Sequence, residues 1–158
     1  MPVIADKENV LSNIIRLIKV CHLTEIPIVV TEQEKLGNTV AEIKNEFSTE
    51  TAIQKIHFNC FESEAFAARV KETGRTTLII AGIEAHICVA QTALAGHPRF
   101  RIHVVGDAAA SRSPDNVLVA LDRMRASGIT ITSTEMVIYE LLRKAGTAEF
   151  KAMLPLVK

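Results

Sequence analysis

Thr76–Gly82, with the sequence TTLIIAG, is the stretch that decides the fold of this chain. A short, continuous apolar run of this kind predicts a strand that is buried on both faces, as the strands of parallel sheets are. Residues 86–95 follow with a helical pattern that ends before Gly96 and Pro98. A strand followed closely by a helix is the repeating unit of α/β proteins.

The same alternation extends in both directions along the chain. Further strands are predicted at residues 27–31, 53–58, 100–105 and 129–132, and further helices at 7–23, 62–72, 113–127, 133–142 and 147–154, with a polar loop over 32–52. We therefore expect a single domain over residues 1–158 with an α/β fold. Its open, mostly parallel sheet would carry helices on both faces, as in Rossmann-like three-layer sandwiches.

The charge balance of the chain limits the classes of partner. Its 158 residues include 18 basic and 18 acidic side chains, so the formal net charge is zero, and aromatic residues make up only 4%. Proteins that bind nucleic acid or membrane surfaces usually carry a basic excess that meets phosphate groups. We therefore expect a small-molecule substrate, with neither nucleic acid nor membrane as a partner.

The cysteines and the hydropathy pattern predict a compartment. Cys21, Cys60 and Cys88 are an odd number of cysteines, which fits reduced thiols better than a disulfide framework. The first residues lack the basic and apolar regions of a secretory signal. The most apolar stretch, residues 78–95, contains Glu84 and predicts protein core rather than a membrane span. A cytoplasmic protein is the expectation.

Cys88 is the first candidate for chemistry. Ligands of open α/β sheets bind outside the carboxyl ends of the strands, and Cys88 falls near the start of the helix that follows Thr76–Gly82. A helix start lowers a thiol pKa because it favours the thiolate, and its backbone N–H groups could stabilise an oxyanion. The alternative is that Cys88 is a small buried apolar residue, as many free cysteines are.

Lys55 is the second candidate, because it lies inside the strand predicted at 53–58. An unpaired charge inside a covered sheet costs free energy, so we expect this lysine near the end of its strand, reaching either a site or solvent. His86 would project from a different helix face than Cys88, so a direct dyad is not expected. The histidines lack metal-ligand spacing and no glycine-rich nucleotide loop is present, so neither a metal nor a cofactor is expected.

Five segments, in order along nearly the whole chain, resemble the isochorismatase-like cysteine hydrolases. They are residues 26–33 (IPIVVTEQ), 54–60 (QKIHFNC), 82–94 (GIEAHICVAQTAL), 105–112 (VGDAAASR) and 132–135 (TSTE). No single segment is specific, but together they are. The resemblance is to isochorismatase domain-containing proteins whose substrate is uncertain.

The resemblance implies a catalytic triad of aspartate, lysine and cysteine. Cys88 would be the nucleophile, and Lys55 would orient groups and stabilise charge. A non-proline cis peptide, here Ile83–Glu84, would turn the backbone N–H groups of Glu84 and Cys88 toward a shared oxyanion hole. In the amidase branch the cysteine attacks a carbonyl, a thioester forms and water releases the acid. The resemblance therefore favours a small amide or a related C–N substrate.

The family's aspartate has no counterpart here, because it ends a first strand that this sequence lacks. That strand would be central, between those at 27–31 and 76–82, and its absence would leave two rows of backbone groups without partners. Three resolutions are open: a longer natural chain, direct pairing of the flanking strands, or a strand donated by another chain. Asp6, Glu32 and Asp107 are possible substitutes, but none lies at the matching position, so we expect impaired activity.

A non-catalytic homologue that acts as a binding or scaffold module is the alternative function. Alkylation of Cys88 that is much faster than that of the other cysteines would favour the hydrolase. A homo-oligomer is also expected, since relatives commonly assemble and the apolar run at residues 150–157 could pack on a partner. The alternative is that this run packs on its own domain.

Overall fold

The protein alternates helices and strands as the apolar runs predict, in a computed structural model that describes residues 4–157. In chain order the elements are α1 (Lys7–Leu23), β1 (Thr31–Gln33), α2 (Ala41–Lys44), β2 (Ile53–Lys55), η1 (Cys60–Glu62), α3 (Glu64–Glu72), β3 (Thr77–Ile83), η2 (Ala85–Val89), α4 (Ala90–Gly96), β4 (Arg101–Ala110), α5 (Pro114–Ala126), β5 (Thr130–Thr132), α6 (Thr134–Leu142) and α7 (Ala148–Val157). All strand pairs are parallel. The predicted α/β fold class is confirmed.

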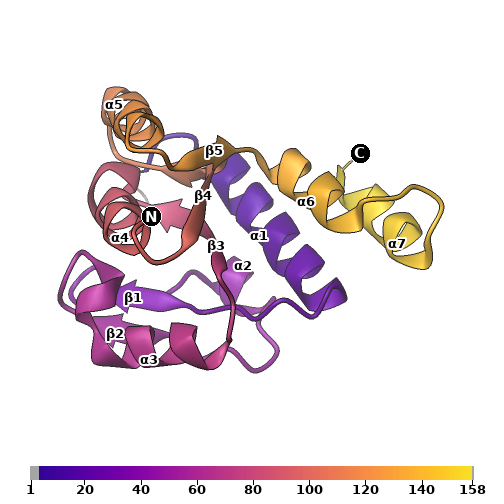
Figure 1. Ribbon diagram of the computed structural model, residues 1–158, viewed down its shortest axis with the longest axis horizontal. Helices are drawn as coiled ribbons and strands as arrows, with labels where there is room; N and C mark the ends of the chain where they lie inside the picture. Colours follow the sequence, from indigo (N-terminus) through magenta and orange to yellow (C-terminus); the bar gives the residue numbers. More distant parts are fainter. Residues whose placement is uncertain (1–3, 158) are drawn as a thin grey trace.

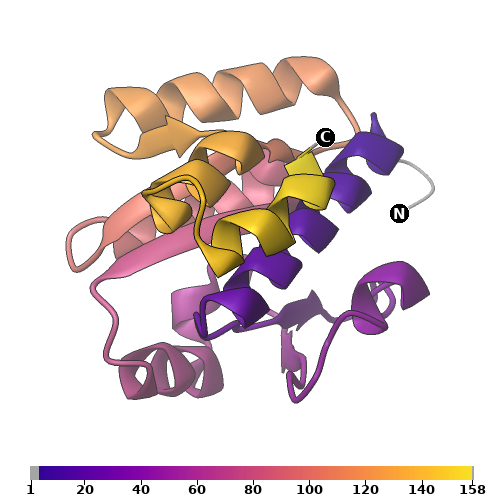
Figure 2. The same cartoon turned by 90° about the vertical axis from the view of Figure 1, so that its right-hand side faces the viewer.

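Helices cover both faces of the sheet formed by β3, β4 and β5, with α4 and α5 on one side and α1 and α6 on the other (Figure 1; Figure 2). Met124 of α5 is fully buried in a cluster with Val104 of β4. On the opposite face, Leu17 of α1 packs with Val105 of β4. Val104 and Val105 of β4 thus face opposite layers, which is why both of these neighbouring residues are apolar.

Serine residues set the starts of three helices. Ser63, Ser113 and Ser133 each accept a hydrogen bond from the backbone N–H three residues later, at the starts of α3, α5 and α6. Such caps satisfy N–H groups that the helix itself leaves free. The predicted starts of α5 and α6 are confirmed, whereas α3 begins after the 3-10 turn η1 rather than at residue 62.

The strands form two sheets rather than the expected single sheet. One sheet pairs β1 with β2, the other has the order β3-β4-β5, and no ladder joins β1 to β3. These are the two strands that the resemblance places on either side of a further strand. Of the three resolutions considered above, direct pairing of the flanking strands is therefore not the one that the structure adopts.

The strand predicted at 53–58 ends already at Lys55. Two further strands differ from the prediction because pairing partners set their boundaries. The strand predicted at 27–31 forms instead at Thr31–Gln33, where β2 supplies the only ladder, from the hydrogen bond of Ile53 N to Val30 O (2.9 Å) to that of Glu34 N to Lys55 O (2.9 Å). Without a partner, an apolar run has no sheet to join. Conversely, β4 runs beyond residue 105 to Ala110, because after a register shift its end pairs with the end of β3.

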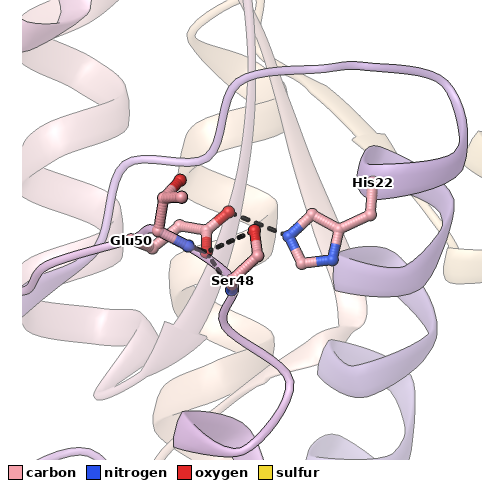
Figure 3. Close-up of polar contacts among 4 residues, drawn as sticks. His22, Ser48 and Glu50 are labelled. Carbon is pink, nitrogen blue, oxygen red and sulfur yellow. Dashed lines mark hydrogen bonds and ion pairs between the residues drawn. The ribbon is translucent and has the colours of Figure 1, made fainter.

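The predicted polar loop over 32–52 contains one short helix, α2, and is tied to α1 by Glu50. The Glu50 carboxylate lies 2.8 Å from His22 Nε2 and accepts hydrogen bonds from the backbone N–H groups of Ser48 (2.7 Å) and Thr49 (3.0 Å) (Figure 3). Burial alone would raise the pKa of Glu50, but hydrogen bonds from His22 and these N–H groups lower it to about 2. An ionised carboxylate therefore holds this loop against α1.

Replacing Glu50 with glutamine is expected to destabilise the fold by about 1–3 kcal/mol at pH 6. A carboxyl whose folded pKa of about 2 lies below its ordinary 4.5 stabilises the protein above pH 4.5. That contribution is lost as the pH falls toward 2, so the two proteins should converge in stability there. Denaturant unfolding at several pH values measures the difference in stability.

Glu46→Gln, which breaks a more exposed pair with Lys19, is the control and should cost less than about 1 kcal/mol. A stability difference between Glu50→Gln and the unmodified protein that does not change with pH would contradict the assignment.

The apolar C-terminal run packs on its own domain. Met153 of α7 is 1% exposed and lies in a cluster with Val20 of α1 and Ile138 of α6. Of the two roles considered for residues 150–157, internal packing is therefore the one observed for Met153. No helix within residues 4–157 has the length and apolar character needed to cross a bilayer.

Candidate active site

The carboxyl ends of β1, β2 and β3 bring three polar side chains together. Gln33 ends β1, Lys55 ends β2, and Cys88 lies in the π-helical turn η2 that follows β3. Lys55 Nζ lies 3.7 Å from Cys88 Sγ, although 33 residues separate them. The two side chains singled out from the sequence thus meet where the fold class places ligand sites.

Lys55 is held in a fixed position by several acceptors. Its side chain is buried, with the residue only 5% exposed. The ammonium donates to Gln33 Oε1 at 2.6 Å and to the backbone oxygens of His57 (3.0 Å) and Phe58 (3.4 Å). None of the ion pairs found within residues 4–157 includes Lys55. The ammonium is therefore hydrogen-bonded but has no carboxylate beside it, and the solvent alternative does not apply.

Gln33 is a site residue that the sequence interpretation missed. Its Oε1 lies between the two candidates, 2.6 Å from Lys55 Nζ and 3.9 Å from Cys88 Sγ. Its Nε2 donates to Ile56 O at 2.7 Å, which fixes the amide so that the oxygen faces the site. The signal that could have found it is its position two residues after the apolar run at 27–31, near the carboxyl end of the predicted strand.

The Cys88 thiol is half-buried, and its pKa is raised above the ordinary value. Burial is the largest cause, the Lys55 ammonium opposes it, and Cys60 and the Glu84 carboxylate raise the pKa further. The lowered pKa expected from a helix start is therefore wrong for this arrangement. Desolvation disfavours the thiolate more than the nearby ammonium favours it.

Glu84 joins β3 to η2 through a left-handed backbone conformation. No peptide bond within residues 4–157 is cis, so the expected cis bond at Ile83–Glu84 is not found. The turn is made by Glu84 instead, with φ 55° and ψ 56°. Cys88 lies in the first turn of η2, where backbone N–H groups have no earlier helical partner and can face a ligand.

The Glu84 side chain forms a network that the sequence interpretation also missed. Its carboxylate lies 2.7 Å from Arg112 Nε and 3.5 Å from His86 Nδ1, and that same nitrogen is 2.9 Å from Ser111 Oγ. His86 thus faces Glu84 and Ser111, in agreement with the expectation that it forms no dyad with Cys88.

The carboxylates considered as substitutes for the aspartate are engaged elsewhere. Asp6 accepts from Asn9 Nδ2 at 2.9 Å, Glu32 accepts from the Thr39 N–H at 2.6 Å, and Asp107 accepts from the Thr134 N–H at 2.8 Å. Within the described part of the chain, no group of three His, Cys, Asp or Glu side chains is arranged to hold a metal ion. The site therefore consists of a thiol, an ammonium and an amide.

Comparison with known proteins identifies the family of this chain. The profile of the isochorismatase domain matches residues 2–136. The chain belongs to the isochorismatase family. The resemblance inferred from the five sequence segments is thus confirmed.

Four similar proteins, three of them solved structures, illustrate the breadth of this similarity. Isochorismatase domain-containing protein 2A of Mus musculus is 37% identical, over 99% of this chain and 76% of its own. MAR1 ribonuclease from Caenorhabditis elegans is 29% identical with a TM-score of 0.90, over 98% of this chain and 81% of that one. YcaC from Pseudomonas aeruginosa, solved with hexane-2,5-diol and covalent acrylamide, is 27% identical with a TM-score of 0.89, over 98% and 81%. YcaC from Escherichia coli, described as an octameric hydrolase of unknown specificity, is 27% identical with a TM-score of 0.86, over 94% and 76%.

Proposed function

We propose that this isochorismatase-family chain is a cysteine hydrolase that acts on a small amide or a related C–N bond. Family membership supports a hydrolase-like function. The observation that carries the cysteine assignment is the 3.7 Å approach of Lys55 Nζ to Cys88 Sγ at the carboxyl ends of the strands. The covalent acrylamide in YcaC gives further support, because acrylamide is an electrophile that adds to nucleophiles.

The proposed reaction has two stages. Cys88 Sγ attacks the substrate carbonyl carbon, and the negative charge that forms on the oxygen is met by the N–H groups of Glu84 and Cys88. The C–N bond then breaks, the amine leaves with the proton that the Cys88 thiol has given up, and a thioester on Cys88 remains. Water adds to the thioester, releases the acid and returns the thiol. Lys55 stabilises the thiolate and the developing charge throughout.

The proposed site lacks an efficient proton acceptor, which supports slow turnover. Gln33 Oε1 is the acceptor within 3.9 Å of the thiol, and an amide oxygen is far less basic than a carboxylate. A positioned general base typically contributes about 10²–10⁴-fold to a rate. Activity is therefore expected to be low, and the covalent intermediate should be easier to detect than product.

A panel of small primary amides and N-carbamoyl compounds tests the proposal. Ammonia or amine release measures turnover, and intact-protein mass spectrometry detects a thioester on Cys88. Cys88→Ala should abolish both signals, whereas Cys21→Ala, which removes a thiol of α1 away from the site, should leave both unchanged. Product or adduct formation that persists in Cys88→Ala would contradict the assignment, as would a panel with no Cys88-dependent signal.

A non-catalytic binding module is the second candidate function. The raised pKa of Cys88, caused first by burial, favours it, because a protonated thiol is a poor nucleophile. RNA as the ligand is disfavoured despite the name of the Caenorhabditis elegans relative, since the net charge is zero. Binding of a panel compound without any Cys88 adduct would favour this second function.

We also propose a cytoplasmic homo-oligomer. The octameric state described for Escherichia coli YcaC supports assembly, as do Leu118 and Val119 of α5, which are 62% and 67% exposed. The free thiols Cys21, Cys60 and Cys88 are suited to a reducing compartment. Light scattering that gives only the monomer mass at micromolar concentration would contradict the oligomer.

A further inference from the structure

Two of the three cysteines lie beside the same strand, β1. Cys60 Sγ is 3.7 Å from Thr31 Oγ1 at the start of β1, and Cys88 Sγ is 3.9 Å from Gln33 Oε1 at its end. Side chains two residues apart on a strand point to the same face, about 6–7 Å from each other. The two thiols therefore lie next to neighbouring positions on one face of β1, although they are far apart in the sequence.

A second contact brings Cys60 to the helical segment that carries Cys88. The backbone N–H of Cys60 donates to Thr92 Oγ1 at 2.9 Å, and Thr92 follows Cys88 by four residues. Residues four apart in a helix lie on the same face, about 6 Å apart along the axis. A disulfide needs its two Cα atoms about 4.4–6.8 Å apart. Two independent contacts thus place the thiols at a spacing of the size that a disulfide spans.

The surroundings of the thiols set the order in which an oxidant meets them. Cys88 is half-buried, and the Lys55 ammonium 3.7 Å from its sulfur favours the thiolate, which is the form that peroxides oxidise. Cys60 is only 8% exposed, so it is shielded from an oxidant in solution. Burial raises the pKa of Cys21 to about 11, so this thiol of α1 stays protonated. A peroxide therefore reacts with Cys88 first, and Cys60 is the second thiol at hand.

We propose that peroxides oxidise Cys88 to a sulfenic acid and that Cys60 resolves it as a reversible Cys60–Cys88 disulfide. In the first step Cys88 Sγ attacks one peroxide oxygen, the O–O bond breaks, and the other oxygen leaves as water or an alcohol with the proton of the Cys88 thiol. In the second step Cys60 Sγ attacks the Cys88 sulfur, the S–O bond breaks, and the hydroxyl leaves with the Cys60 proton as water. Two electrons pass from the two sulfurs to the peroxide.

The disulfide protects Cys88 from permanent damage. A sulfenic acid that meets more peroxide proceeds to sulfinic and sulfonic acids, which thiol reductants do not restore. A disulfide, by contrast, is reduced by thiols through exchange. The oxidation requires no amide substrate, so the proposal stands independently of the proposed hydrolase.

Thiol mapping of the full chain after peroxide treatment tests the inference. The reduced protein is exposed to a small excess of hydrogen peroxide at pH 8, where more of the Cys88 thiol is ionised than at neutral pH, and catalase stops the reaction. N-ethylmaleimide then blocks the remaining thiols before the protein is unfolded and digested without reductant. Mass spectrometry of the peptides identifies each linked pair. Cys60→Ser removes the resolving thiol, and Cys21→Ala is the matched control.

The unmodified protein and Cys21→Ala are expected to give the Cys60–Cys88 linkage within a single chain, and dithiothreitol should return nearly all of the Cys88 thiol. Cys60→Ser should instead accumulate sulfinic and sulfonic acids at Cys88, so that dithiothreitol no longer recovers most of this thiol. Alkylation of Cys88 before any peroxide, at least as fast as in the unmodified protein, shows that the Cys60→Ser variant is folded. Cys60→Ala replaces it if that check fails, and the mapping of the unmodified protein depends on neither variant.

Three results would overturn the proposal. The first is that Cys88 of the unmodified protein is oxidised beyond the sulfenic acid while Cys60 stays a free thiol. The second is that Cys88 forms its disulfide with Cys21 or with a second chain instead of Cys60. The third is that a large excess of peroxide leaves the Cys88 thiol unoxidised, because the first step then does not occur.

Discussion

Gln33→Glu is expected to raise the rate of Cys88 acylation by about 10- to 100-fold. The new carboxylate would occupy the place of an amide oxygen that lies 2.6 Å from Lys55 Nζ and 3.9 Å from Cys88 Sγ. It would accept the thiol proton as the sulfur attacks, and it would also provide the buried ammonium with a counter-ion. Single-turnover mass spectrometry with the best compound of the amide panel measures the rate.

Gln33→Met is the matched control, because it keeps the length of the side chain but has no oxygen. It should acylate no faster than the unmodified protein. If Gln33→Glu is folded and still acylates at the original rate, the missing proton acceptor does not limit the reaction. If Gln33→Met gains as much as Gln33→Glu, the effect comes from packing rather than from basicity.

Lys55→Met is expected to slow alkylation of Cys88 by about tenfold or more near pH 8. An opposite charge within about 4–6 Å typically lowers the pKa of an acid by about 1–3 units, and the ammonium is 3.7 Å from the sulfur. Its removal raises the pKa of Cys88 further, because burial and the Glu84 carboxylate then act unopposed. The rate of iodoacetamide modification against pH, resolved by peptide mass spectrometry, measures the shift.

Lys19→Met, which removes a half-exposed lysine of α1, is the control for this second prediction. Its Cys88 profile should coincide with that of the unmodified protein. Because the thiol ionises as pH rises, the Lys55→Met profile should move to higher pH and reach a similar plateau. Coincident profiles for Lys55→Met and the unmodified protein would show that the ammonium does not influence the thiol.

Lys55 and Cys88 could each be singled out from local signals in the sequence. Thr77–Ile83 is a continuous apolar strand followed at once by helical residues, and Lys55 lies inside the strand predicted at 53–58. A buried lysine must lie at a strand end, and the carboxyl ends of parallel strands meet at one edge. These rules left Lys55 either at a site or in solvent, and the pairing of Lys55 with Cys88 came from the resemblance to the isochorismatase-like hydrolases.

Gln33 was not predicted as a site residue because β1 forms later in the chain than its apolar pattern indicates. The β-branched residues lie at 27–31, but the ladder forms at Thr31–Gln33, where β2 is available. The limits of a strand depend on pairing partners that are remote in sequence. β1 forms no ladder with β3, so β2 alone sets the limits of β1 among the described residues. The same dependence extends β4 to Ala110.

The electrostatics of Cys88 could not be predicted from its position in the chain. A helix start favours the thiolate, and that effect is local. Burial and the carboxylate of Glu84 act through the folded structure, and together they raise the pKa of the thiol. Glu84 was identified for its backbone N–H, whereas its side chain, which contacts Arg112, is the part that adds charge near the site.

Competition among the three cysteines for a limiting amount of iodoacetamide tests most directly whether Cys88 is the nucleophile. Burial, and then Glu50, raise the pKa of Cys21 to about 11, and Cys60 is only 8% exposed. Cys88 is half-buried and is the cysteine with an ammonium 3.7 Å from its sulfur. We predict that Cys88 carries most of the label at pH 8. Equal, slow labelling of all three thiols, or faster labelling of Cys21, would contradict the account.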